Sequence, residues 1–281
     1  QPASMRFTVS EEHRQYALDR LTAVLKVKAA TKKELASIAG VLTWVSFVHT
    51  PGRPRCQCVY DAARLGSSGK KSDVVPLRGP LLRQLRWWRS TLASSQFRGS
   101  RIWAGSESPA TVLLRSDASG DDGWGACVGN FHFVGPWPAD LLDAHMLFKE
   151  LVPVVLVISL ISPLLTEAVF GVAVDNTGAA FAVNKLTCRD RLARRLLQQL
   201  ASDLDAAGHT ALADHVRRHR SVHADEMSHA LHAKRWAPIL AQHGSRKRRA
   251  AEEYWFFPFV AQCLVTGECF TAQFRMRKTL F

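Results

Sequence analysis

The first hundred residues place their apolar side chains at helical spacing. Leu18, Leu21 and Leu25 recur at intervals of three and four residues, and a second apolar stripe runs from Leu35 to Val45. A Thr-x-x-Glu sequence typical of a capping box precedes each stripe. No strand-like alternation of apolar and polar positions appears here. The pattern therefore predicts an all-helical region over residues 1–105.

The pattern then changes to short apolar segments separated by turn residues. Thr111 to Asp117 and Ala168 to Asp175 read as strands that each end in an acidic residue, with a long helix expected between them, from about Pro138 to Leu160. The predicted order of elements, βββαβααβα, is typical of an α/β domain. We therefore expect a mixed sheet flanked by helices over residues 106–235. Residues 236–281 form a basic and aromatic C-terminal extension whose fold the pattern does not predict.

Composition and charge narrow the possible partners. The chain has 281 residues, of which 47% are hydrophobic, and this excludes wholesale disorder. It carries 37 Lys+Arg against 24 Asp+Glu, which gives a net charge of +13. This charge favours a polyanionic partner such as nucleic acid, although a basic surface without such a partner would carry the same net charge. The longest apolar run, Leu151 to Thr166, is sixteen residues with two prolines. A membrane span needs about 20 residues, so we expect a core helix, no membrane and an intracellular protein.

Four acidic residues occupy positions suited to chemistry. Asp117 and Asp175 end two strands, Glu150 lies on the long helix, and Asp225 opens the last helix. Two carboxylates about 4 Å apart repel by roughly 4 kcal/mol at an effective dielectric constant of 20. Mg²⁺, which prefers oxygen ligands, offsets this repulsion, and two such ions can clamp a phosphodiester. The alternative is that each acid is an ordinary cap or turn residue.

These acids stand in sequences that resemble a known family. The stretch from about residue 111 to 231 resembles the ribonuclease H domain of reverse transcriptases, in particular those of tyrosine-recombinase (DIRS-like) retrotransposons. Residues 31–42 and two further sequences upstream resemble the helical thumb and connection region of the same enzymes, while the polymerase palm is absent. The residues that carry the resemblance are Ser116-Asp117-Ala118-Ser119-Gly120, Lys149-Glu150-Leu151, Val174-Asp175-Asn176-Thr177 and Ala224-Asp225-Glu226-Met227-Ser228, with Pro51-Gly52-Arg53 and Leu85-Arg86-Trp87-Trp88 upstream.

The resemblance implies a fold and an activity. The fold would be a ribonuclease H-like mixed sheet preceded by a helical thumb- or connection-like subdomain. The activity would be cleavage of the RNA strand of an RNA–DNA hybrid with two Mg²⁺ ions, for which Mn²⁺ could substitute. One ion would lie between Asp117 and Asp225, and the other would be held by Asp117, Glu150 and Asp175. His223, just before the last acid, would help to release the product.

The same resemblance assigns contacts to the nucleic acid. Ser119, Gly120 and Asn176 would meet the sugars of the hybrid, where the 2′-hydroxyl distinguishes RNA from DNA. Arginines near the start of one predicted helix and after the last strand suit phosphate contacts, although a solvated basic face would have the same composition. These arginines are Arg191, Arg194, Arg195, Arg217 and Arg218.

Two departures from the family pattern support an alternative. Pro153 follows Glu150 by one turn, where a proline can kink the helix and displace the carboxylate. The palm is missing, so a palm domain would have to act as a partner. The alternative is a non-catalytic, RNA-binding subunit of a large ribonucleoprotein, such as an organellar ribosome, with the other subunits and structured RNA as partners. The first function places the protein in the nucleus or cytoplasm, and the second places it in an organelle.

Overall fold

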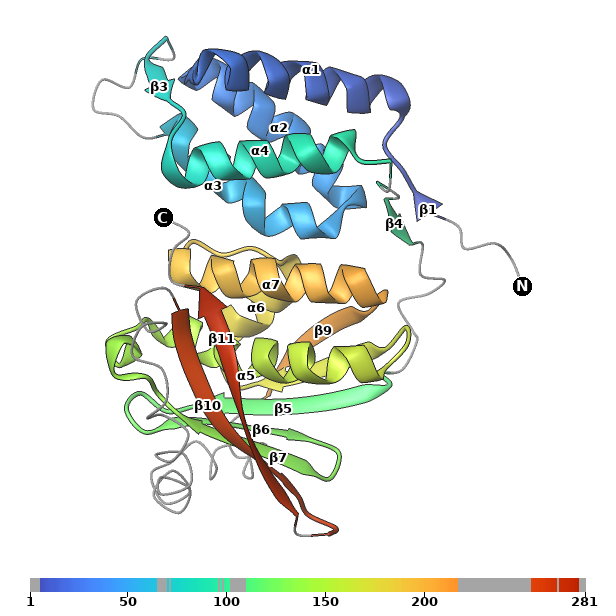
Figure 1. Ribbon diagram of the computed structural model, residues 1–281, viewed down its shortest axis with the longest axis vertical. Coiled ribbons are helices and arrows are strands. Elements are labelled where there is room, and N and C mark those ends of the chain that lie inside the picture. Colours follow the sequence, from blue (N-terminus) through green and yellow to red (C-terminus); the bar gives the residue numbers. More distant parts are fainter. Residues whose placement is uncertain are drawn as a thin grey trace. The chain divides into compact units, whose positions relative to one another are not determined.

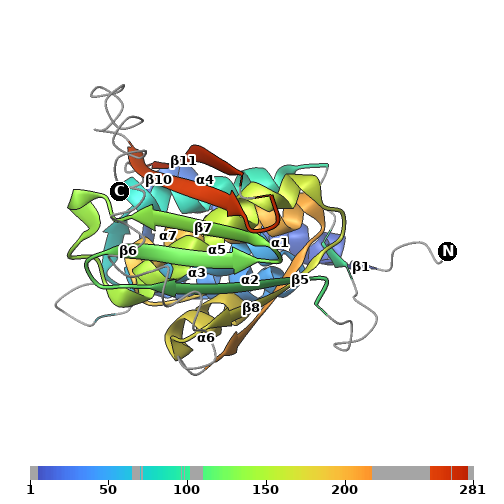
Figure 2. The same ribbon diagram turned by 90° about the horizontal axis from the view of Figure 1, so that it is seen from below.

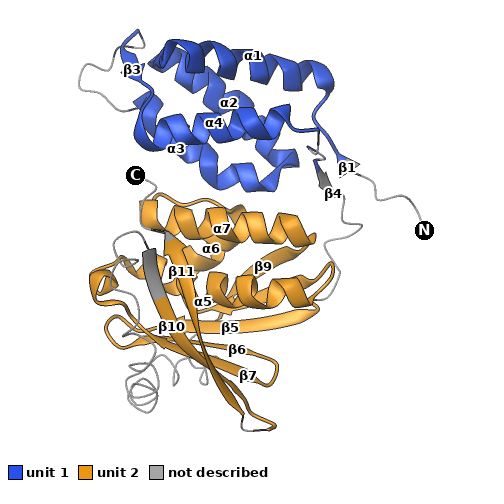
Figure 3. Ribbon diagram, in the orientation of Figure 1, with its two compact units in different colours: residues 1–107, 280–281 blue, residues 108–279 orange. Residues whose placement is uncertain are grey.

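The computed structural model describes residues 6–64, 70, 72–95, 97, 99–101, 110–216, 254–266 and 268–277. The chain divides into two compact units (Figure 3). The first comprises residues 1–107 with 280–281, and the second comprises residues 108–279. Each unit has its own hydrophobic core.

The described residues of the first unit form four α-helices (Figure 1). Short strands join its segments: β1 pairs with β4, and β2 pairs with β3. The expectation of a helical region is confirmed, although the sequence pattern missed these two- and three-residue strands. The elements are β1 (Arg6–Phe7), α1 (Glu11–Val27), β2 (Ala29–Thr31), α2 (Lys32–Val48), the 3₁₀ turn η1 (Thr50–Gly52), α3 (Arg53–Arg64), β3 (Val74–Pro76), α4 (Gly79–Ala93) and β4 (Ser100–Arg101).

Side-chain caps fix where the first two helices begin. Ser10 caps α1, so the capping box expected two residues earlier is wrong. At α2 the expected capping box is present: the Thr31 hydroxyl accepts from Glu34 N at 3.2 Å, and the Glu34 carboxylate accepts from Thr31 N at 2.7 Å. The apolar stripes of the helices then meet in a core that includes Leu21, Leu35 and Trp88.

The second unit is a seven-stranded mixed sheet with strand order β11-β10-β7-β6-β5-β8-β9. The β5–β8 and β8–β9 pairs are parallel, and the other pairs are antiparallel. This is the mixed α/β, ribonuclease H-like arrangement expected from the sequence. The strands are β5 (Val112–Ala118), β6 (Gly123–Val128), β7 (Phe131–Pro136), β8 (Val169–Val174), β9 (Thr210–His215), β10 (Tyr254–Cys263) and β11 (Cys269–Arg277).

Helix α5 (Met146–Ile161) forms the centre of this unit. It packs on β5 and β6 and against α7 (Arg191–Ala207), while α6 (Thr177–Lys185) packs on β8 and β9 (Figures 1 and 2). The helix begins eight residues later than expected, because residues 139–141 form the 3₁₀ turn η2 (Ala139–Leu141) and His145 caps the helix. A second 3₁₀ turn, η3 (Ser162–Leu164), follows it.

The apolar character of α5 reflects a core helix. By length and composition Met146–Leu164 could cross a membrane, and among the described residues it is the one such segment. Of its most apolar window, 67% is buried inside the protein. A helix that is apolar on all sides is typical of a position between a sheet and other helices.

The C-terminal hairpin is part of the sheet. β10 pairs with β7, with Val260 opposite Val134, and β11 continues the sheet beyond β10 (Figure 2). Phe257, Phe259 and Ala261 alternate along β10 and enter the main core. The sequence pattern predicted no fold for these residues.

Candidate metal centre

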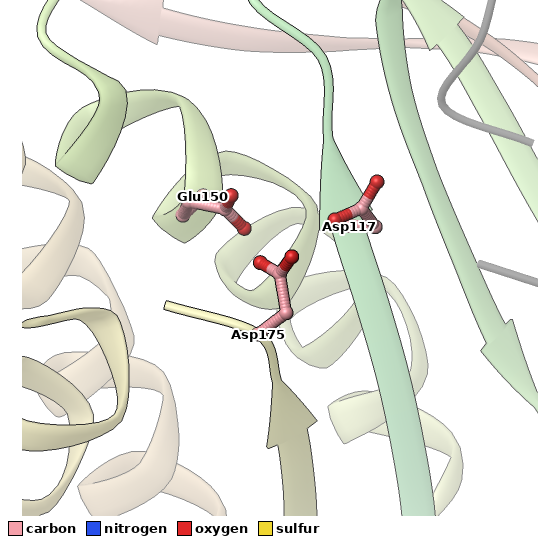
Figure 4. A group of neighbouring side chains, drawn as sticks. All are labelled: Asp117, Glu150 and Asp175. Carbon is pink, nitrogen blue, oxygen red and sulfur yellow. The ribbon is translucent and has the colours of Figure 1, made fainter. Parts of the chain in front are cut away.

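Three acidic side chains meet at one edge of the sheet. In the parallel β5–β8 pair Ser116 lies opposite Val174, which places Asp117 beside Asp175, directly after β8. Glu150, in the second turn of α5, points at the same place (Figure 4). One carboxylate oxygen from each residue lies within 4.8 Å of the other two. The expected adjacency of the two strand ends is therefore confirmed.

Pro153 does not move Glu150 out of this cluster. The proline lies inside α5, where it removes one backbone donor from the helix. Phe148, Leu151 and Val152 are fully buried around it. Packing of the helix on the sheet fixes its position, so the displacement expected from the sequence is not observed.

The environment of the three carboxylates differs. Asp117 and Glu150 are each 2% exposed, while Asp175 is half-buried. Buried carboxylates are costly unless a cation or hydrogen bonds compensate for the lost hydration. Hard divalent cations such as Mg²⁺, which bind carboxylate oxygens, match this donor set in ligand type and charge. The three residues could therefore hold a metal ion.

Several residues predicted for the site lie outside the described part of the chain. Asp225 and His223 belong to this group, as do Arg217 and Arg218. The acidic cluster that the structure describes has three members. The second ion site, expected between Asp117 and Asp225, stays a prediction.

The residues expected to meet sugars flank the cluster. Ser119 follows β5 and accepts hydrogen bonds at its hydroxyl from Asp122 N and Gly123 N, both at 2.9 Å. Gly120, the next residue, is exposed. Asn176 follows Asp175 and caps α6, with its Oδ1 accepting from Ala179 N at 3.0 Å. Their contacts with nucleic acid stay a prediction.

The three arginines predicted on α7 differ in exposure. Arg191, the first residue of the helix, is exposed. Arg194 and Arg195 are 7% and 9% exposed, and Arg194 donates to the Arg189 carbonyl at 3.4 Å. Of the three, Arg191 presents its guanidinium group most openly to a phosphate.

Two residues near the cluster received no role in the sequence analysis. The His215 ring at the end of β9 hydrogen-bonds through Nε2 to the backbone carbonyl of Asp175, at 3.1 Å. Lys149, adjacent to Glu150, is buried and binds the backbone of two loops. Lys149 stands within one of the family-like sequences, but residue type alone does not reveal a partner that is distant along the chain.

Comparison with known proteins adds a distant structural likeness. No family model and no curated protein matches the sequence. Among solved structures, the foamy viral protease-reverse transcriptase in complex with double-stranded DNA matches with a TM-score of 0.29 and 14% identity. The match covers 74% of this chain and 35% of that chain, so the present chain spans about a third of the viral protein's length. Membership of the DIRS-like class stays a prediction.

Proposed function

We propose that this protein is a divalent-metal-dependent endonuclease that cuts the RNA strand of RNA–DNA hybrids. One observation carries the proposal: three acidic side chains from β5, α5 and the end of β8 place carboxylate oxygens within 4.8 Å of one another. Two of these residues are almost fully buried. A fold that had no use for a cation would gain nothing from three repelling charges at one point.

The acidic residues of the cluster would share one role in the proposed site. Asp117, Glu150 and Asp175 would be the ligands of Mg²⁺ or Mn²⁺. Bound divalent ions would activate water and stabilise the leaving oxygen of the cleaved phosphodiester. Asp175 is half-buried and so would lie on the side open to substrate. By the family resemblance, Asp225 would be the fourth acid, and His223 would assist product release.

The flanking residues suit recognition of RNA. Ser119 and Asn176 carry polar side chains beside the cluster, and Gly120 is exposed, although its carbonyl accepts from Lys149. A 2′-hydroxyl both donates and accepts hydrogen bonds, so it is the group that such residues would distinguish. We infer that these three residues contact the sugar of the strand to be cut.

The first unit supports a nucleic-acid partner independently. Tyr16, Trp44 and Phe47 expose 47%, 47% and 67% of their surface. The guanidinium carbons of Arg20 and Arg53 lie 5.8 Å and 6.0 Å from the ring centroids of Tyr16 and Phe47. Exposed aromatic rings beside cations are typical of surfaces on which bases stack near phosphates. We call the surface of Tyr16, Arg20, Trp44, Phe47 and Arg53 the aromatic face.

The proposed evolutionary origin is a retrotransposon reverse transcriptase of the DIRS-like class. It rests on the sequence resemblance, in which the helical unit corresponds to the thumb and connection region. A polymerase palm would then be a partner domain of this part of the chain.

A cleavage assay tests the function. Wild-type protein is incubated with a labelled RNA–DNA hybrid and Mg²⁺, with double-stranded DNA and double-stranded RNA as other substrates. We expect cleavage of the RNA strand of the hybrid alone. Asp175→Asn should abolish it, while Asp214→Asn, which alters an exposed acid on β9, should not. Tight binding of structured RNA without cleavage would instead favour the ribonucleoprotein subunit.

A further inference from the structure

Lys149 is a buried cation beside the acidic cluster. Lys149 is 3% exposed, and its Nζ donates to the backbone carbonyls of Gly120 and Leu142. The same Nζ lies 5.7 Å from the centroid of the Trp137 ring. Neither ion pair seen among the described residues involves Lys149. Burial of an ammonium group requires strong hydrogen-bond acceptors, and here backbone carbonyls supply them.

The first of these carbonyls belongs to the turn that follows Asp117. Two side chains from elsewhere donate to this turn. Trp137 donates its indole Nε1–H to the Ser119 carbonyl at 2.9 Å, and Lys149 donates to the next carbonyl, that of Gly120. Two consecutive carbonyls are thus held by side chains from outside the turn. The Ser119 hydroxyl closes the turn from inside by accepting from two backbone N–H groups. We call residues 119–123 the clamped turn.

The clamped turn and α5 carry the two buried acids. Asp117 lies two residues before the turn, and Glu150 is the neighbour of Lys149 on the helix. The separation of their carboxylates therefore depends on how the end of β5 sits on α5. Because the two carboxylates repel each other when no cation is bound, this separation would increase unless something opposed it.

We propose that Lys149 is a positioning residue that holds the end of β5 against α5, so that Asp117 and Glu150 stay within reach of one divalent ion. Trp137 assists through its bond to the same turn. The inference rests on the proposed metal-dependent function and adds a residue to that site. Groups that orient metal ligands typically change metal affinity 10- to 100-fold when removed, so we expect a loss of about that size.

The decisive variants each remove one of the two side-chain hydrogen bonds to the clamped turn. Lys149→Met removes the ammonium group and keeps an unbranched side chain. Trp137→Phe removes the indole donor together with part of a buried ring, and it leaves Lys149 in place, so it serves as the second variant if Lys149→Met folds poorly. Lys32→Met is the matched control. Lys32 is also buried, at 7% exposed, and it pairs with Asp73 within the first unit, whereas Lys149 belongs to the second. Asp117→Asn reports on the metal centre itself.

Two measurements on the full chain test the inference. The first is Mn²⁺ affinity, from the paramagnetic resonance signal of free Mn²⁺. The second is hydrogen exchange of the amides of the clamped turn in metal-free protein. We expect Lys149→Met to weaken Mn²⁺ binding about 10- to 100-fold and to speed exchange in the turn. Trp137→Phe should do both to a smaller extent, and Lys32→Met should do neither.

The outcomes separate this inference from the proposed function. If Asp117→Asn loses Mn²⁺ while Lys149→Met binds it as tightly as wild type, the metal centre stands and the role of Lys149 is overturned. Unchanged exchange in the clamped turn of Lys149→Met overturns it as well. If the wild-type protein itself binds no Mn²⁺, the proposed function fails, and the positioning role fails with it.

Discussion

The side chain of Asn184 pairs with both backbone groups of Ala213. Its Nδ2 donates to the Ala213 carbonyl at 2.7 Å, and its Oδ1 accepts from the Ala213 N–H at 2.8 Å. Asn184 lies on α6, and Ala213 lies in the middle of β9, an edge strand of the sheet. An unpaired edge exposes backbone groups to which another chain can add. The amide group therefore covers one position of that edge and ties β9 to α6.

Removing this amide should destabilise the second unit modestly. Asn184→Ala loses two hydrogen bonds, each with a net contribution of about 0.5–1.5 kcal/mol, and water can replace part of them because the residue is exposed. We expect a loss of about 1 kcal/mol in the free energy of unfolding. Asn184→Asp should lose at least as much, because a carboxylate oxygen would then face the Ala213 carbonyl. Urea denaturation measures both, with Lys185→Ala as control. Wild-type stability in both variants would contradict a role for this pair.

Metal should stabilise the protein through the three carboxylates. At a Mg²⁺ or Mn²⁺ concentration of 100 times the dissociation constant, binding adds about 2.7 kcal/mol to the free energy of unfolding. Asp117→Asn should abolish this increment and the heat of binding in isothermal titration, while Asp214→Asn should keep both. Equal metal binding by wild type and Asp117→Asn would show that the three carboxylates are not the metal site.

In metal-free protein, Asp117→Asn should not lower the free energy of unfolding, in contrast to its effect when metal is bound. Without a cation the buried carboxylates of Asp117 and Glu150 repel each other beside Asp175. Asp117→Asn removes one charge and nearly retains the shape, so we expect it to be at least as stable as wild type in buffer that contains a chelator. Thermal unfolding with and without chelator measures this change. A large loss of stability in both conditions would show that Asp117 supports the fold through other contacts.

The acidic cluster could be predicted from the sequence, because each acid can be placed from the secondary-structure element that carries it. Each of two apolar strands ends in an acid, and adjacent parallel strands present their carboxyl ends at the same edge, so Asp117 and Asp175 had to meet once the strands paired. Glu150 follows from its place on the intervening helix. The effect of Pro153 could not be judged, because it depends on how tightly α5 is packed on the sheet.

Contacts that are remote in sequence account for what the sequence pattern missed. Lys149 reaches the Gly120 carbonyl, which lies 29 residues earlier in the chain, and nothing in either segment signals this contact. The strand β10 is rich in aromatic residues, but its partner β7 precedes it by more than a hundred residues. Periodicity identifies elements, whereas the partners of an element depend on the topology of the whole sheet.

Acid should destabilise the first unit through His49. Its ring stacks near Trp87 and Phe97, with centroids 5.7 Å and 5.3 Å away. Burial, assisted by the charge of Arg55, lowers the pKa of His49 from 6.5 to about 4. The unfolded chain therefore takes up the proton first as the pH falls. The stabilising contribution is complete above about pH 6.5 and is lost progressively towards pH 4.

The size of this effect is bounded by the shift in the His49 pKa. A shift of one pKa unit corresponds to about 1.4 kcal/mol, so the bound is roughly 3 kcal/mol. We expect His49→Gln to flatten the dependence of the urea midpoint on pH between 6.5 and 4. His13→Gln, an exposed histidine on α1, is the control. An unchanged pH dependence in His49→Gln would contradict a buried neutral imidazole.

The affinity for nucleic acid should become less sensitive to salt concentration when Arg191 is removed. Each phosphate contact contributes about one unit to the slope of log affinity against log salt concentration. Because Arg194 and Arg195 are buried, we expect Arg191→Ala to flatten the slope by about one unit and further alanine substitutions to affect folding more than the slope. Filter binding of a hybrid across a salt series measures it. Arg191→Lys should keep the slope, and a slope unchanged in Arg191→Ala would place Arg191 outside the interface.

Gly40 tests whether nucleic acid approaches the aromatic face. It lies in the interior of α2, one turn before Trp44, where glycine is unfavourable by about 1 kcal/mol relative to alanine. A β-carbon at this position would meet nothing within 4 Å, so packing inside the unit does not explain the glycine. Glycine also permits close approach of a ligand to the backbone, and a strand that stacks on Trp44 would pass over this position.

Gly40→Ala should therefore change stability and binding in opposite directions. We expect the free energy of unfolding to rise by roughly 0.5–1 kcal/mol, while affinity for nucleic acid falls because the added methyl group meets the bound strand. Trp44→Ala should weaken binding by about 1–3 kcal/mol, the usual contribution of one stacked base. Ser37→Ala, exposed one turn earlier on α2, is the matched control. If Gly40→Ala stabilises the protein and binds hybrid as tightly as wild type, then nucleic acid does not lie across this part of the aromatic face.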